Sequence, residues 1–109
     1  MSIFVRGRFD ARDGRRAEFE EIALALAARA ADEPGTRTYR WLSAGEGSYI
    51  VIEEYVDEAA AMAHNEGVAD LLTRVPDCAE LVLAEVYGPS TLAWAEGKPR
   101  VTLHPDFSG

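Results

Sequence analysis

The first stretch of the chain alternates between apolar and mixed positions. In residues 3–9 one side of the alternation is apolar: Ile3, Val5, Gly7 and Phe9. The other side is mixed: Phe4, Arg6 and Arg8. Because successive side chains of a strand point to opposite faces, this period of two predicts a β-strand with one buried face.

The period then changes to that of a helix. Over residues 15–31 the apolar positions recur at spacings of three and four: Phe19, Ile22, Ala23, Leu26 and Ala30. Glutamates occupy the early turns, where the helix dipole favours negative charge. We therefore predict an amphipathic helix, which Pro34 and Gly35 end.

A hairpin, a second helix and a fourth strand follow. Residues 36–43 and 49–56 are rich in β-branched and aromatic residues, and the glycine-bearing loop AGEGS joins them, which predicts an antiparallel hairpin. Asp57 is placed to cap a helix that runs to about Gly67. The short helical segment VADLLTR then leads to a strand over residues 79–88.

This order of elements predicts a ferredoxin-like βαββαβ fold of the α+β class, in which four antiparallel strands carry both helices on one face. The length and the 48% of hydrophobic residues are typical of a single domain, residues 1–109. The later strands carry large apolar groups on both faces, with Tyr39 and Trp41 against Leu42, and Val82 and Val86 against Leu81 and Leu83. A solvent-facing sheet surface should be mostly polar, so we expect a second copy of the chain to cover it in a symmetric homodimer.

The C-terminal extension, residues 89–109, has little helical pattern. Val101 and Leu103 alternate with Thr102 within it. This pattern favours an extra edge strand, and whether such a strand crosses to the partner subunit stays open.

The chain is acidic, with 11 Lys and Arg against 19 Asp and Glu and a net charge of −8. This charge repels phosphate backbones and anionic lipid head groups, so we expect neither nucleic acid nor a membrane as a partner. No apolar run approaches the roughly 20 residues that span a membrane, and a secretory signal pattern is absent. The single Cys78 cannot form an internal disulfide, and together these features predict a soluble cytoplasmic protein.

Two segments, EPGTRTYRW and YIVIEEYVDEAAAMAHN, resemble signature segments of the antibiotic biosynthesis monooxygenase family. The resemblance covers about residues 3–88. It implies a dimeric α+β barrel and, as in some members, oxidation of quinols or polycyclic phenols by O2 with no cofactor. A divergent branch degrades haem, with an Asn on the first strand and a ligating His beyond the second helix. This chain has Arg6 or Arg8 and VADLLTRV in those regions, so haem degradation is only a third alternative.

His64 is the residue on which an enzymatic interpretation depends. On the second predicted helix, four residues share one stripe at spacings of four, three and four: Ala60, His64, Gly67 and Leu71. If this stripe faces the sheet, His64 points at the strand aromatics. Two interpretations follow: His64 is a packed and hydrogen-bonded core histidine, or it lines a ligand pocket. The resemblance favours neither alone, although the matching histidine of relatives often lines the pocket.

If the pocket is catalytic, His64 is the natural general base, because histidine titrates near neutral pH. Tyr39, Trp41 and Tyr55 are candidates to stack on or hydrogen-bond a small aromatic substrate. Asn65 would orient a carbonyl, and Arg6 or Arg8 would stabilise developing negative charge. The alternative function is a non-catalytic, dimeric small-molecule binding protein on the same scaffold.

Two other groupings carry less weight. His64, Glu66 and His104 do not have the spacing of a metal site, so we expect none. Glu53 and Glu54 are neighbours on a strand and face opposite ways, so they cannot act as a carboxylate pair.

Overall fold

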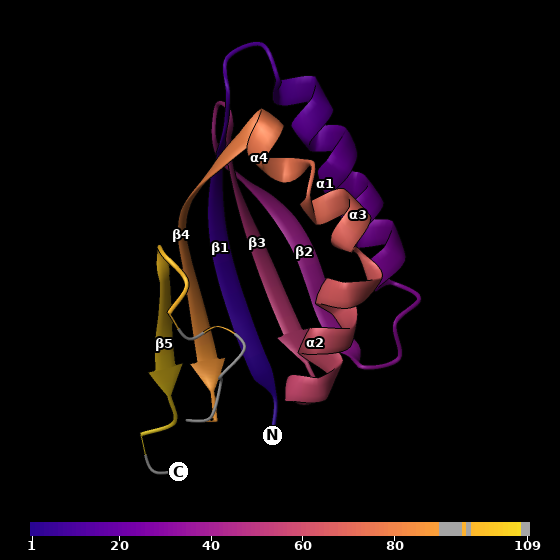
Figure 1. The fold of residues 1–109 in the computed structure, drawn as a ribbon, viewed down its shortest axis with the longest axis vertical. Helices are drawn as coiled ribbons and strands as arrows, with labels where there is room; N and C mark the ends of the chain where they lie inside the picture. The colour runs from indigo at the N-terminus through magenta and orange to yellow at the C-terminus, as the bar shows by residue number, and fades with distance from the viewer. Residues whose placement is uncertain (90–94, 96, 108–109) are drawn as a thin grey trace.

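The computed structural model describes residues 1–89, 95 and 97–107 (Figure 1). Its elements, in chain order, are β1 (Ile3–Ala11), α1 (Arg16–Ala30), β2 (Thr36–Gly45), β3 (Ser48–Tyr55), α2 (Glu58–Gly67), α3 (Ala69–Leu72), α4 (Val75–Cys78), β4 (Ala79–Gly88) and β5 (Val101–Pro105). The predicted α+β order of strands and helices is thus confirmed, with the segment after α2 forming two short helices.

One sheet runs through the described part of the chain in the order β2-β3-β1-β4-β5. The first four strands pair antiparallel, as the ferredoxin-like prediction requires, while β5 pairs parallel to the outer side of β4. Residues 101 and 103, the apolar positions of the extension, lie opposite Ala84 and Val86 of the same chain. The extra edge strand is therefore present and makes the sheet five-stranded, while its crossing to a partner stays a prediction.

All four helices lie on one side of the sheet (Figure 1). The predicted stripe of α1 forms the centre of the core, with Phe19, Ile22 and Leu26 each no more than 2% exposed. Phe9 of β1 and Trp41 of β2 pack against this stripe from the sheet. The apolar stripe of α1 that the sequence predicts is thus the stripe that the structure buries.

A β-bulge between β1 and β4 changes which side chains share a face. Arg8 lies opposite Leu83, but the next residue, Phe9, lies opposite Leu81, so Val82 is an extra residue in β4. Strict alternation predicted Leu81 and Leu83 on the same face, and this is wrong. Leu81 lies on the face that the helices cover, and Leu83 lies with Arg8 on the opposite face.

The start of α2 packs directly on the turn between α1 and β2. Asp57 caps the helix as predicted, because its side chain accepts a hydrogen bond of 2.8 Å from the backbone N–H of Ala60. A Cβ added at Gly35 would lie 2.6 Å from the Cβ of Ala60. Gly35 is therefore required for the close approach of α2. The backbone of Gly35 is not left-handed, so the end of α1 does not itself require a glycine at this position.

Gly35→Ala tests this close approach. The new methyl group must push α2 away, so we expect the free energy of unfolding to fall by roughly 1–3 kcal/mol in urea titrations. Gly67→Ala is the matched control, because a Cβ there meets nothing closer than a Glu33 oxygen at 3.9 Å. That variant should be at least as stable as the wild type, since alanine is the better helix former. Equal stability of Gly35→Ala and the wild type would contradict the packing argument.

Candidate functional site

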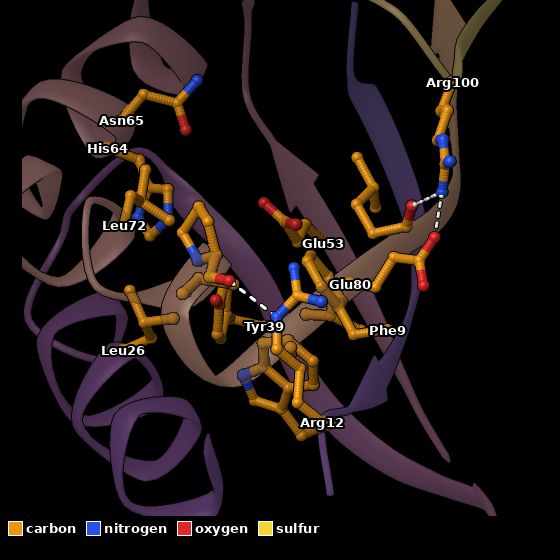
Figure 2. A pocket seen from close by; sticks show the side chains of 16 residues that line it. Phe9, Arg12, Leu26, Tyr39, Glu53, His64, Asn65, Leu72, Glu80 and Arg100 are labelled. Atoms are coloured by element: carbon orange, nitrogen blue, oxygen red, sulfur yellow. Dashed lines mark hydrogen bonds and ion pairs between the residues drawn. The ribbon is translucent and has the colours of Figure 1, made fainter. Parts of the chain in front are cut away.

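A cavity of about 640 Å³ lies between the helices and the sheet. This volume is typical of small-molecule sites. Its lining combines apolar and aromatic side chains with a few polar groups (Figure 2): Phe9, Arg12, Leu26, Tyr39, Trp41, Val51, Glu53, His64, Asn65, Leu72, Val75, Pro76, Ala79, Glu80, Leu81 and Arg100. The helix-covered face of the sheet is therefore the face that lines the cavity, a point that the sequence left undecided.

His64 reaches this cavity from α2 and is 3% exposed. Its Nδ1 lies 2.7 Å from Oε1 of Glu33, which belongs to the turn after α1. The hydroxyl of Thr36 also donates to this oxygen, over 2.8 Å. A carboxylate acceptor holds the histidine proton on Nδ1 and leaves the lone pair of the neutral ring on Nε2. The ring is thus both packed and hydrogen-bonded, and it still lines the cavity.

Two tyrosines enclose the His64 ring, with ring centroids 5.2 Å away for Tyr39 and 5.4 Å away for Tyr55. Burial raises the pKa of both phenols well above the usual range, with nearby carboxyl groups adding to the effect. Both hydroxyl groups are therefore neutral hydrogen-bond donors at ordinary pH. Tyr39 lines the cavity, so its hydroxyl is available to a ligand oxygen.

Glu53 of β3 supplies a carboxyl group to the same cavity. Burial raises the pKa of Glu53, although the Tyr55 hydroxyl, which donates to Glu53, and the neighbouring His64 oppose the shift. A carboxyl group of this kind holds its proton to higher pH than usual and is suited to act as a general acid. Histidine and carboxylic acid thus meet in one pocket, which is the arrangement that acid–base chemistry needs.

Trp41 contributes an unusual polar atom. Its indole Nε1 is buried and makes no hydrogen bond of normal geometry within the described residues, but it lies close enough to the Tyr39 hydroxyl to oppose the rise in the pKa of that phenol. Buried donors are almost always paired in folded proteins. The Trp41 N–H is therefore an interior neighbour of the Tyr39 hydroxyl, and it is too deeply buried to meet an oxygen of a bound ligand directly.

The structure brings together four of the residues predicted for the site: His64, Tyr39, Trp41 and Asn65. Tyr55 is 1% exposed and is not part of the cavity wall, so it acts through its contacts with His64 and Glu53 rather than by touching a ligand. In Figure 2, His64 and Asn65 project from neighbouring positions of α2.

Arg6 and Arg8 do not reach this cavity, which corrects their assignment to it. Both lie on the opposite face of the sheet, where they line a separate hollow of about 180 Å³ together with Glu85. Arg6 is hydrogen-bonded and ion-paired to this glutamate. The reason is the alternation of β1, whose even positions point away from the helices.

Sequence reasoning missed four residues of the site: Glu33, Glu53, Arg12 and Arg100. For Glu53 a signal existed, because it alternates with the buried Val51 and Tyr55 and therefore lies on their face. As predicted, Glu54 points the other way and forms no pair with it. Arg12 and Arg100 carry no comparable signal, since their places depend on contacts that are distant in sequence.

The described residues contain no group of three or more His, Cys, Asp or Glu side chains placed to hold a metal ion. Within the same residues, no helix has the length and apolar character that crossing a membrane requires.

A protein-family model and several solved structures match this chain. The sequence model of a family described as antibiotic biosynthesis monooxygenase matches residues 2–85. MupZ from Pseudomonas fluorescens has a similar structure, with a TM-score of 0.81 and 18% identity over 96% of this chain and 89% of its own. Residues 89–109 make up about a fifth of the chain, so a match over 96% of the chain must include most of them.

Two further solved structures match a smaller share of this chain. SnoaB, a cofactor-independent oxygenase from Streptomyces nogalater, has a TM-score of 0.67 and 22% identity over 78% of this chain and 89% of its own. Rv0793 from Mycobacterium tuberculosis has a TM-score of 0.73 and 21% identity over 79% of this chain and 92% of its own. At these identities the similarity shows the fold alone, and a search of curated proteins gives no match.

The raised pKa of Glu53 predicts a pH effect on stability. Above its ordinary value of 4.5, the folded protein holds a proton at Glu53 that the unfolded chain releases, so the contribution of Glu53 to stability falls as pH rises. Glu53→Gln removes this titration and keeps an oxygen that can accept from Tyr55. We therefore expect the free energy of unfolding of the variant, relative to the wild type, to increase with pH above 4.5 until the folded-state pKa is passed.

Urea unfolding at a series of pH values measures this difference. Glu54→Gln is the matched control for the loss of one carboxylate from the same strand. A difference between Glu53→Gln and the wild type that is constant over pH would contradict the assignment of a raised pKa.

Proposed function

The chain belongs to the antibiotic biosynthesis monooxygenase family, and we propose that it is a cofactor-independent monooxygenase that oxidises a quinol-like or polyphenolic small molecule with O2. The observation that carries this proposal is the buried His64, paired with the half-buried Glu33, beside Glu53 in an aromatic-lined cavity. The oxygenase SnoaB, which shares the fold, supports the reaction class.

The first step is removal of a proton from an activated CH2 group of the substrate, such as that of an anthrone. Nε2 of His64 accepts this proton, and Glu33 stabilises the imidazolium through the Nδ1 hydrogen bond. The hydroxyl of Tyr39, in the cavity wall, is suited to stabilise the negative oxygen of the resulting anion. The apolar part of the wall strengthens this interaction by limiting contact with water.

The anion then passes one electron to O2, and the two radicals combine to form a carbon–oxygen bond. Glu53 protonates the new peroxide and, as a carboxylate, takes the second proton from the same carbon. The oxygen–oxygen bond breaks, and the leaving hydroxide takes the proton held by His64. One CH2 group and one O2 become one carbonyl and one water, and both side chains return to their starting forms.

We further propose that the chain works as a homodimer through the sheet face without helices. Phe4, Ile52 and Leu83 lie on that face among Arg6 and Arg8, and each of the three apolar side chains is 38–45% exposed. A second copy of the same face would cover them with a self-complementary contact. The cavity lies on the opposite, helix-covered face and would stay open in such a dimer.

Oxygen uptake with anthrone and reduced naphthoquinones tests the catalytic proposal. His64→Ala should lower the enzymatic rate by about 10²- to 10⁴-fold after subtraction of autoxidation, because the general base is lost. Added imidazole should restore part of the rate if the folded pocket survives. His104→Gln is the matched control, since His104 lies beside Thr102 and Glu85 and not in the cavity wall.

Two results would contradict the catalytic proposal. A wild-type protein that binds quinones but consumes no O2 above the buffer rate would be the small-molecule binding protein of the alternative interpretation. Turnover that does not respond to His64→Ala would exclude this histidine as the base.

Analytical ultracentrifugation tests the dimer. The wild type should sediment with twice the mass of one chain, and Ile52→Glu should sediment as a monomer, because a dimer would bury the new charge. Arg6 and Arg40 lie opposite Ile52 on the neighbouring strands, so the monomer can accommodate the glutamate. Leu24→Glu, at a position of α1 that is 72% exposed, is the control that should stay dimeric. A monomeric wild type would contradict the proposal.

A further inference from the structure

Arg12 is held at the edge of the cavity by two separate contacts. Its backbone N–H donates to the carbonyl of Cys78 over 2.8 Å, and its side-chain Nε donates to the carbonyl of Pro76 over 2.9 Å. The guanidinium is thereby fixed against α4, and it extends toward the middle of the cavity (Figure 2). Its two terminal nitrogens have no ion-pair partner within 4.0 Å among the described residues.

A second arginine lies across the same opening. Nη1 of Arg100 donates to Glu80 over 2.7 Å and to the carbonyl of Leu81 over 2.9 Å, so its charge is already paired. The backbone of Arg100 has φ of 63°, a left-handed conformation that residues with side chains adopt infrequently. Such outliers are found where the surrounding structure fixes a side chain for a purpose. Here the outlier places Arg100 at the cavity wall, just before β5.

The charges that line the cavity do not cancel at the Arg12 side. Of its two carboxyl groups, Glu80 is paired with Arg100, and neither Glu80 nor Glu53 forms an ion pair with Arg12. The charge of Arg12 therefore has no compensating anion in the wall. On a chain with a net charge of −8, an arginine in the cavity wall that no carboxylate pairs favours a negatively charged ligand.

We propose that Arg12 binds a carboxylate carried by the substrate, with Arg100 as a second cation beside it, so that the substrate is an aromatic acid rather than a neutral quinol. A guanidinium fixed through Nε presents its two Nη groups in the planar fork that matches a carboxylate. The acid group would stay at the opening, and the ring would extend past Trp41 and Tyr39 toward His64. This inference deepens the proposed function and rests on it for the aromatic nature of the substrate.

Titration calorimetry of anthraquinone-2-carboxylate and of its neutral carboxamide tests the proposal, because it measures binding and requires no turnover. The wild type should bind the carboxylate more tightly, and only that affinity should fall as NaCl is raised. Arg12→Gln should weaken carboxylate binding by roughly tenfold or more and leave carboxamide binding unchanged, as expected for the loss of a charge-assisted hydrogen bond. Arg100→Gln should have a smaller effect, because Glu80 already pairs with Arg100.

Arg74→Gln is the matched control, because it removes one positive charge outside the cavity wall. Arg12→Lys keeps the charge but not the fork and should bind the carboxylate with intermediate affinity. Thermal melts show whether Arg12→Gln is folded, and the salt dependence of the wild type tests the proposal without any variant.

Three results would overturn the inference: equal affinity of the wild type for the two ligands, binding of neither ligand, or an Arg12→Gln variant that weakens both ligands to the same extent. These outcomes are distinct from failure of the oxygenase proposal. If the protein oxidises neutral anthrone but shows no preference for the carboxylate, only the proposed role of Arg12 is contradicted. If the protein prefers the carboxylate but consumes no O2 with any substrate, only the proposed oxygenase activity is contradicted.

Discussion

The hydrogen bond between His64 and Glu33 is the interaction on which the site depends, because it joins two parts of the fold beneath the helices. His64 belongs to α2, and Glu33 belongs to the turn between α1 and β2. A buried imidazole without a partner would be costly, so the pair defines how deeply α2 lies on the sheet. The contact of Gly35 with Ala60 in the same region makes this depth sterically feasible.

The cavity that results has two chemically different ends. Near α2, His64 and Glu53 form an acid–base pair that is surrounded by neutral phenols. Near α4 and β5, Arg12 and Arg100 contribute positive charge at the opening. A ligand that satisfies both ends needs an acidic group on one side and a removable proton on the other. This polarity, rather than the volume of the cavity, restricts which aromatic molecules fit.

Membership of the family explains the scaffold but not the reaction, because one fold can carry different sites. The solved structures that match this chain share between 18% and 22% of its sequence in the three cases described. The functional argument therefore rests on particular side chains: a base with a fixed tautomer, an acid with a raised pKa, and the neutral phenol of Tyr39. Each of these is a property of the local environment rather than of the fold.

The sequence by itself determined the order of the elements, the helix-covered core and the importance of His64, because periodicity, capping and turn chemistry act between near neighbours in the chain. It also indicated that Tyr39, Trp41 and His64 share one region. Only the tertiary structure decided that Arg12 and Arg100 replace Arg6 and Arg8 at the cavity, and that a bulge separates Leu81 from Leu83. The partner of His64 likewise became known only from the fold, since Glu33 is 31 residues away. Strand register and loop contacts bring such distant residues together, and neither leaves a local pattern in the sequence.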